Sequence, residues 1–261
     1  MSWSIEDLLH RRTDLSTFVV HFTRTSGGYS SKDNLLSILG QSKIEARTAF
    51  GMGRHEAPDD KAFQESQRAV CFTETPIEHA WMMCAEIEGR ANRFGPHGLA
   101  FTKVWARSNH ANRVWYLDIS VRGGASWLTE PIAMLRQEAV DAADRSGKSL
   151  TEYPITRLLP FIEQMGPTNY FRKEFWWERE WRHVGALAFR WLNVVAVFAP
   201  YQEHGEIRDA MAEMGRAELP TPPLLDPSWG LERMISALRG VPTEEAGPLP
   251  ASLRVVRRNA S

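Results

Sequence analysis

Short segments rich in β-branched and aromatic residues recur along the whole chain, and this recurrence limits the folds available to it. Such segments are typical of strands. Strands are predicted at residues 17–23, 44–47, 69–74, 98–105, 113–119, 175–185 and 191–199. Helices are predicted at residues 4–12, 33–40, 76–90, 129–146, 155–163, 203–214 and 229–238. Because several strands follow one another with no helix between them, the sequence predicts an α+β fold rather than a doubly wound parallel sheet.

Two further segments have a distinctive composition. Residues 191–199 are almost continuously apolar, which predicts a central buried strand. Residues 51–68 are polar and contain glycine, proline and many charges, which predicts a surface loop.

The composition fits one soluble domain. With 261 residues, 43% of them hydrophobic and 24% charged, the chain can bury a core of ordinary size. We expect a single catalytic-type domain over residues 1–240 and a poorly ordered tail over residues 241–261, which is rich in proline and small residues. The formal net charge of -1 supplies no overall field that would attract nucleic acid or an anionic membrane.

The cysteines and the N-terminus indicate where the protein acts. Cys71 and Cys84 are too few for a disulfide framework or a cysteine zinc site, which favours a reducing cytosol. The N-terminus lacks the apolar core of a signal peptide, and no apolar run is long enough to span a bilayer. We therefore expect a cytoplasmic protein without a membrane partner; the sequence leaves a homo-oligomer open.

The stretch 175–185 concentrates aromatic, acidic and basic residues. Side chains alternate between the two faces of a strand, so Glu178 and Glu180 are predicted to share one face. The opposite face would carry Trp177, Arg179 and Trp181. Two carboxylates beside large apolar rings are costly unless they are paired, which suggests a functional site. An exposed strand whose acids pair with neighbouring arginines is an equally good interpretation of this stretch alone.

Familiar catalytic signatures are absent from the sequence. It contains no phosphate-binding loop, no nucleophile elbow and no His-Glu-x-x-His, and its eight histidines show no metal-ligand spacing, so we expect no metal. What remains is polar groups on strands: His21 and Thr23 on the first, Thr73 and Glu74 on a middle one. A lone strand histidine is more often a core residue than a catalyst, but a glycine-bearing polar loop directly follows His21.

Six short motifs occur in a characteristic order. They are His-Phe-Thr at 21–23, Asn-Leu-Leu-Ser-Ile-Leu at 34–39, Val-Cys-Phe-Thr-Glu-Thr-Pro at 70–76, Gly-Leu-Ala-Phe-Thr-Lys at 98–103, Val-Trp-Tyr-Leu at 114–117 and Glu-Arg-Glu-Trp-Arg at 178–182. In this order the set resembles the abortive-infection proteins of the AbiGi type, which are phage-resistance proteins. It also resembles the ADP-ribosyltransferase fold, in which mixed or antiparallel sheets of short strands form a central cleft with peripheral helices.

The resemblance implies a toxin or effector in antiviral defence that transfers ADP-ribose from NAD to a cellular or phage macromolecule. By resemblance, Glu180 would stabilise the positive charge that develops on the ribose, as a carboxylate does in glycosidases. Glu178 would orient the acceptor or act as a base, and His21, supported by Thr23, would hold the adenosine-side ribose. From residue type, Tyr29 or Phe72 could stack on nicotinamide, and Arg24 or Lys103 could meet the pyrophosphate. The middle residue of the transferase triad would be Phe72 or Thr73, with Tyr116 as a further candidate.

Two other functions stay open from the residues alone. In a metal-dependent nuclease, Asp118 with Glu178 and Glu180 would hold Mg²⁺, and Lys103 would lie near the phosphate. In a non-catalytic binding or sensor module, the tryptophans would be core or interface residues and the acids would pair with arginines. The transferase interpretation makes one geometric demand: His21 and Glu180 must face the same cleft.

Overall fold

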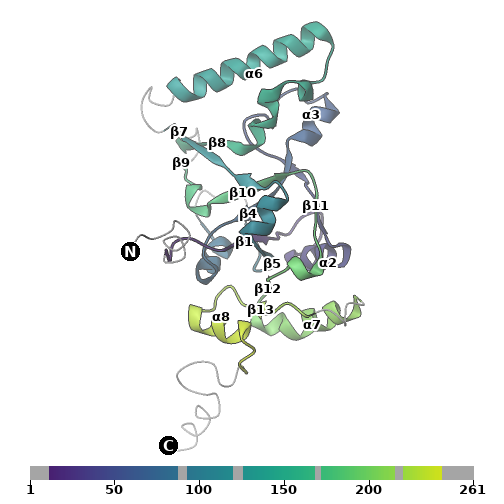
Figure 1. The fold of residues 1–261 in the computed structure, drawn as a ribbon, viewed down its shortest axis with the longest axis vertical. Coiled ribbons are helices and arrows are strands. Elements are labelled where there is room, and N and C mark those ends of the chain that lie inside the picture. The colour runs from purple at the N-terminus through teal and green to yellow at the C-terminus, as the bar shows by residue number, and fades with distance from the viewer. Residues whose placement is uncertain (1–11, 88–92, 120–125, 168–171, 215–219, 243–261) are drawn as a thin grey trace, which may run out of the picture.

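The computed structural model describes residues 12–87, 93–119, 126–167, 172–214 and 220–242. Its centre is an eight-stranded sheet that lies between helix α6 at one end of the molecule and helices α7 and α8 at the other (Figure 1). The strand order is β13-β12-β5-β1-β4-β10-β6, and β3 pairs with β4 beside this path. The predicted helix 4–12 and nearly all of the tail lie outside the described residues.

The strands are short throughout. The main sheet consists of β1 (Phe18–Phe22), β3 (Thr48–Ala49), β4 (Arg68–Thr73), β5 (Gly98–Thr102), β6 (Asn112–Arg113), β10 (Glu180–Val184), β12 (Ala196–Phe198) and β13 (Leu224–Leu225). Two small sheets flank it, made of β2 (Lys43–Ile44) with β11 (Leu187–Ala188), and of β7 (Trp115–Asp118), β8 (Ile162–Pro167) and β9 (Arg172–Lys173). Among the described strand pairs, only β12–β13 and β7–β8 are parallel. These mixed sheets confirm the predicted α+β class.

Seven α-helices are described, and most are short. They are α2 (Ser31–Gln41), α3 (Lys61–Ser66), α4 (Ala80–Cys84), α5 (Lys103–Ser108), α6 (Ser126–Ser146), α7 (His204–Glu213) and α8 (Leu231–Leu238). Single 3₁₀ turns occur at Ile77–His79, Leu150–Glu152, Pro154–Arg157, Leu159–Phe161, Trp176–Glu178, Trp191–Asn193 and Tyr201–Glu203. Within the described residues, no helix is both long and apolar enough to cross a membrane.

The main sheet opens between β1 and β4. β1 pairs with β5 over five residues and β4 pairs with β10 over five, whereas β1 and β4 are in register only at Val20 and Thr73. Beyond this pair, the ring of His21 reaches across and its Nδ1 lies 2.8 Å from the carbonyl oxygen of Cys71. The pair β1–β5 and the pair β4–β10 therefore diverge on one side of the Val20–Thr73 contact, where β1 and β4 are not paired through their backbones.

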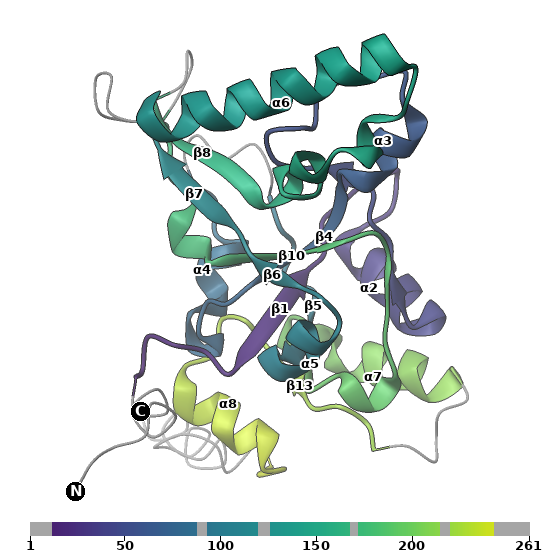
Figure 2. The same ribbon diagram turned by 45° about the horizontal axis from the view of Figure 1, so that its top comes forward.

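Both faces of the sheet are buried. Along β1, Val19 belongs to one hydrophobic core, whereas Val20 and Phe22 belong to another on the opposite face. A third core lies under α6, where the helical spacing of Ala139 and Ala143 places both on its inner side. Figure 2 shows α6 lying across one end of the molecule, over the segment that carries the 3₁₀ turns after it.

Several predicted elements are confirmed. The structure has strands at 18–22 and 68–73 and helices at 31–41, 126–146, 204–213 and 231–238, all within three residues of the predicted bounds. Local signals account for this agreement. Helix α2, for example, is capped by Ser30: its side chain accepts a hydrogen bond from the backbone N–H of Asp33, and the Asp33 carboxylate accepts one from the backbone N–H of Ser30.

Other predictions are wrong, for identifiable reasons. The predicted strand 98–105 ends at Thr102, because the Thr102 hydroxyl accepts from the backbone of Trp105 and starts α5 there. The apolar run 191–199 begins with a 3₁₀ turn, and its strand β12 lies next to the edge strand rather than at the centre. The predicted helix at 155–163 is replaced by 3₁₀ turns and the start of β8. The helix predicted at 76–90 ends at Cys84, and the segment 51–68, predicted to be a loop, contains α3.

Candidate functional site

A cavity of about 540 Å³ lies at the gap between β1 and β4. Its walls come from β1, α2, β2, β3, β4, β8, β9, β10 and the 3₁₀ turn before β10, so segments far apart in the sequence meet around it. The volume lies within the range of small-molecule and cofactor sites, roughly 300–1,000 Å³. The cavity is therefore large enough to hold a small molecule or a cofactor.

Five of the nine predicted site residues line this cavity. They are His21, Thr23, Arg24, Glu178 and Glu180. His21 and Glu180 thus meet the geometric demand that the transferase interpretation makes.

The other four predicted residues do not line the cavity. Tyr29 is 63% exposed on the loop before α2, and Phe72 is buried in the core. Thr73 is buried and engaged with the backbone, and the Lys103 ammonium pairs with the buried carboxylate of Glu74 at 2.8 Å. The geometry therefore does not support nicotinamide stacking by Tyr29 or Phe72, or pyrophosphate binding by Lys103.

The two acids reach the cavity from different backbone structures. The predicted continuous strand is wrong here: Trp176–Glu178 form a 3₁₀ turn, Arg179 has a φ of 48° in the left-handed region, and β10 begins at Glu180. The hydroxyl of Thr73 donates to the carbonyl of Glu178 at 2.5 Å, which ties this turn to the end of β4. The turn therefore places both carboxylates at one cavity without the strand alternation that the sequence suggested.

The backbone of Glu180 is held by β7 and by the residue between β6 and β7. Its N–H donates to the hydroxyl oxygen of Tyr116 at 3.1 Å, and its carbonyl accepts from the N–H of Val114 at 3.0 Å. Burial, reinforced by the Glu180 carboxylate, raises the pKa of Tyr116, so its hydroxyl stays protonated. Tyr116 thus contributes to the site as a support for Glu180.

The next residue, Trp181, faces away from the cavity, as the alternation along β10 requires. Its indole Nε1 donates to Glu74 Oε2 at 2.7 Å, while Lys103 and Arg113 each donate to Oε1 at 2.8 Å. Glu74 is fully buried, and these three donors satisfy its charge. This cluster fixes the far side of β10 and leaves Glu180 on the cavity side.

The Glu180 carboxylate is paired with Arg182, two residues along the same face of β10. Arg182 Nε lies 2.9 Å from Oε1 and Nη2 lies 2.8 Å from Oε2, which makes a bidentate pair. The Arg182 side chain is only 2% exposed, whereas the Glu180 side chain is 16% exposed. Burial opposes the charge on Arg182, but Glu180, together with Cys71 and Glu163, outweighs it and raises the pKa of the guanidinium, which is therefore cationic.

A second buried acid, Glu163 on β8, lies close to Arg182 and forms further ion pairs. Its Oε1 lies 3.6 Å from Arg182 and accepts from the backbone N–H of Gly51 at 2.9 Å, and its Oε2 pairs with Lys173. Burial opposes ionisation of Glu163, but the nearby Arg182, Lys173 and Arg54 outweigh it and hold its pKa below the ordinary value. We call Glu163, Lys173, Glu180 and Arg182 the cavity network, since all four line the cavity.

His21 is held as a neutral ring. Its Nδ1 donates to the Cys71 carbonyl oxygen, because a carbonyl can only accept, and this assigns the proton to Nδ1. Burial lowers the pKa of the ring. The Nε2 lone pair is then left to accept a hydrogen bond, for example from a hydroxyl group. The neighbouring Thr23 is buried, with its hydroxyl 2.7 Å from the Ser31 carbonyl oxygen, so it supports the strand end.

The wall of the cavity beside α2 carries cations. Arg24 Nη2 donates to the Thr48 hydroxyl at 3.2 Å, and Arg47 Nη1 lies 3.4 Å from the side-chain oxygen of Asn34. Asn34 also donates to the carbonyl of Arg24 at 3.0 Å, which fixes the loop that follows β1. Asn34 is a neutral partner of Arg47, and no ion pair to Arg47 occurs among the described residues. This wall therefore suits an anionic group of a ligand.

The nuclease interpretation needs Asp118 beside the two cavity acids. Asp118 does not line the cavity, although Glu178 and Glu180 do. Among the described residues, no group of three or more histidine, cysteine or acidic side chains could hold a metal ion. The structure therefore does not assemble the ligand set that this alternative proposes.

Sequence reasoning missed much of the cavity. Arg182 could have been found, because it stands two residues from Glu180 and must share its strand face. Glu163 and Lys173 had no such signal: they come together only through the pairing of β8 and β9, across a segment whose strand character the sequence did not show. Arg54 likewise lies in the stretch 51–68, which the composition assigned to a surface loop, and Phe50 directly precedes that stretch.

Comparisons with known proteins add one structural likeness. No family model and no curated protein matches the chain. Among solved structures, the Thermus sp. 2.9 DarT in complex with NAD+ aligns with a TM-score of 0.36 and 13% sequence identity. The alignment covers 81% of this chain and 96% of that one.

Proposed function

We propose that this protein is an ADP-ribosyltransferase that uses NAD as its donor substrate. The observation that carries the proposal is the joint placement of His21 and Glu180 on one cavity of about 540 Å³. The cavity also brings together the two acids and the cations that the reaction requires. In line with the sequence resemblance, the acceptor would be a cellular or phage macromolecule, and the biological role would be antiviral defence.

The chemistry assigns a distinct task to each side of the cavity. The bond from nicotinamide to ribose breaks through a transition state with positive charge on the sugar, and an adjacent carboxylate stabilises that charge. Glu180 has this role, and Glu178, on the preceding turn, orients the acceptor or removes its proton. The neutral ring of His21 accepts a hydrogen bond from a ribose hydroxyl through Nε2.

The remaining parts of NAD fit the other walls. Arg24, with Arg47 beside it, meets the pyrophosphate, since guanidinium groups bind phosphate oxygens in pairs. The rings of Phe94 and Phe175 line the cavity, where Tyr29 and Phe72 do not, and supply apolar surface for nicotinamide.

The proposal is tested by incubating purified protein, alone and with cell lysate, with radiolabelled NAD. The wild type should release nicotinamide and label a macromolecule, and Glu180→Ala should reduce both by roughly 100-fold or more. Glu203→Ala is the matched control, because it removes a glutamate that does not line the cavity. If Glu180→Ala labels as well as the wild type does, the role of Glu180 is wrong. Nucleic-acid degradation that stops on addition of EDTA would support the nuclease instead, and no response in either assay would support a binding module.

A further inference from the structure

We propose that Arg182 is a positioning residue, whose guanidinium fixes the orientation of the Glu180 carboxylate against the cavity. This inference rests on the proposed function and extends it to a residue that would not itself touch NAD. The contacts of Arg182 carry the inference, because they hold the guanidinium in one place and direct it at one acid.

The pairing with Glu180 determines the plane of its carboxylate. Two parallel hydrogen bonds, at 2.9 and 2.8 Å, join the planar guanidinium to the two carboxylate oxygens. A single bond would let the carboxylate rotate, but a bidentate pair does not. Each carboxylate oxygen keeps a second lone pair for another donor, and Glu180 is the more exposed member of the pair.

The guanidinium is itself fixed from three other directions. Its Cζ lies 4.7 Å from the centre of the Phe50 ring, its Nη1 donates to the Pro160 carbonyl at 2.5 Å, and Glu163 lies 3.6 Å from Nη2. These contacts come from three separate segments of the chain, and the Arg182 side chain is 2% exposed. An aromatic ring, a backbone carbonyl and a buried acid therefore all contact the one arginine that pairs with Glu180.

A lysine at this position could not reproduce the arrangement. Its ammonium keeps the charge but is a point donor without the planar fork, so it would pair with one oxygen and leave the carboxylate free to turn. A buried ion pair that serves stability alone would tolerate such a change in orientation. A pair that positions Glu180 for the reaction would lose turnover, since displacement of a catalytic group by about 1 Å can cost on the order of 100-fold.

The test is a double-mutant cycle on NAD hydrolysis, with Arg182→Lys, Glu180→Gln and the combined variant. We expect Arg182→Lys to lower kcat by roughly 100-fold and to change KM by less than about threefold, because NAD contacts other walls. In the Glu180→Gln background, Arg182→Lys should not lower kcat further, because Arg182 acts through Glu180. Arg136→Lys is the control: Arg136 also pairs with a glutamate, Glu56, at 2.7 Å, and neither residue lines the cavity.

The possible outcomes are distinct. A wild-type kcat in Arg182→Lys, or an equal loss in both backgrounds, overturns the positioning role. A wild type that neither binds nor hydrolyses NAD overturns the proposed function itself. If circular dichroism shows that Arg182→Lys does not fold, Glu163→Gln takes its place in the cycle, because it loosens the guanidinium from the other side. It should lower kcat by roughly fivefold to tenfold in the wild-type background only, and the same loss in both backgrounds again overturns the role.

Discussion

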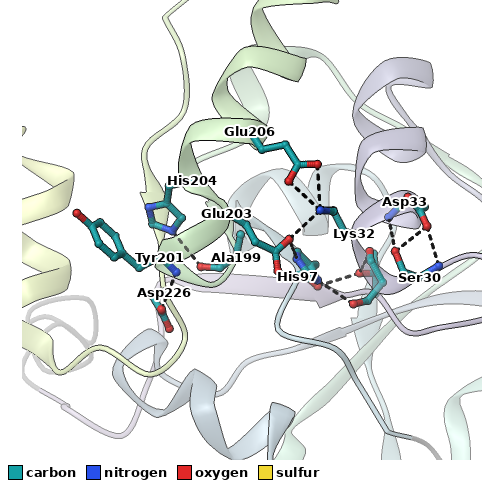
Figure 3. A network of polar contacts seen from close by, with 12 residues as sticks. Ser30, Lys32, Asp33, His97, Ala199, Tyr201, Glu203, His204, Glu206 and Asp226 are labelled. Carbon is teal, nitrogen blue, oxygen red and sulfur yellow. Dashed lines mark hydrogen bonds and ion pairs between the residues drawn. The ribbon is translucent and has the colours of Figure 1, made fainter.

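Two of the networks of polar side chains in the described part of the chain differ in what surrounds them. The cavity network joins Glu180, Arg182, Glu163 and Lys173 on the wall of a large hollow. A second one, the α2–α7 network, joins Lys32 and Ser31 at the start of α2 with His97, Glu203 and Glu206. Figure 3 shows Lys32, His97, Glu203 and Glu206 of this network. Both connect distant segments through short hydrogen bonds, so connectivity alone does not separate a site from a structural contact.

Three residues of the α2–α7 network contact one another in the succession serine, histidine, acid, as in the catalytic triad of a hydrolase. The Ser31 hydroxyl lies 2.7 Å from His97 Nδ1, and His97 Nε2 lies 3.2 Å from Glu203. However, Ser31 is buried, and none of the three lines the cavity. A nucleophile without access to substrate cannot act, so the arrangement fastens α2 to α7.

The two networks differ most in how far their charged side chains are removed from water. In the cavity network, Arg182 and Glu163 have side chains that are 2% and 5% exposed, whereas Lys32 and Glu206 are 27% and 62% exposed. Exposed pairs contribute little to stability, but a buried charge is costly once its partner is removed. Buried charges that face a hollow therefore mark the functional site better than a dense set of hydrogen bonds does.

The largest expected effect is the destabilisation caused by Glu163→Ala. This change leaves Lys173 and part of the Arg182 charge without a buried partner, and it should lower the free energy of unfolding by about 3 kcal/mol. Glu203→Ala in the α2–α7 network should cost about 1 kcal/mol or less, because Glu203 is partly exposed. Urea denaturation followed by circular dichroism measures both. Equal losses would mean that burial does not separate the two networks.

Next in size is the effect of Glu178→Gln on transfer. If Glu178 serves the acceptor, labelling should fall by roughly 10- to 100-fold while hydrolysis of NAD by water stays within a few-fold of the wild type. Parallel measurement of labelled acceptor and released nicotinamide distinguishes these steps. Equal losses in both would give Glu178 a role in breaking the nicotinamide bond, shared with Glu180.

Histidines of the two regions should have the same effect on stability and different effects on function. Burial lowers the pKa of both His21 and His97 in the folded protein. The unfolded chain then binds more protons, so stability is complete above the unfolded pKa of about 6.5 and falls as the pH drops below it, by up to about 1.4 kcal/mol per pH unit for each histidine.

His21→Gln and His97→Gln should each flatten this decline, as denaturation at pH 7.5 and 5.5 would show. Only His21→Gln should raise the KM for NAD, since only His21 lines the cavity. A raised KM in His97→Gln would show that α2 transmits changes from its network to the cavity.

The sequence predicted the elements that local chemistry determines. Helix α2 follows from its capping residues, and β1 and β4 follow from their β-branched and aromatic composition. The faces of Glu180 and Trp181 also follow from alternation along β10. The strand 98–105 was wrong because the cap at Thr102 overrides the apolar pattern after it.

The candidate site was predictable only where its residues are neighbours in the sequence. Glu178 and Glu180 are separated by one residue, whereas Glu163 and Lys173 join them through the pairing of β8 with β7 and β9. Such contacts depend on tertiary structure, for which a single sequence holds no local signal. Lys103 is the opposite case, a residue whose type suggested the site and whose position excludes it. Its ammonium could bind phosphate, but it pairs instead with the buried carboxylate of Glu74, which directly follows β4.

The smallest expected effect is that of Glu206→Gln, and it tests whether the α2–α7 network is separate from the cavity. Lys32 keeps Glu203 as a partner at 3.3 Å after this change, and Glu206 is largely exposed. The free energy of unfolding should therefore fall by less than about 0.5 kcal/mol, and 0.5 M NaCl should abolish the difference by screening. The KM for NAD should not change, although α2 carries Asn34 on its cavity side. A change in KM would mean that an exposed pair at one end of α2 sets the position of the cavity wall, and the two networks would then be one.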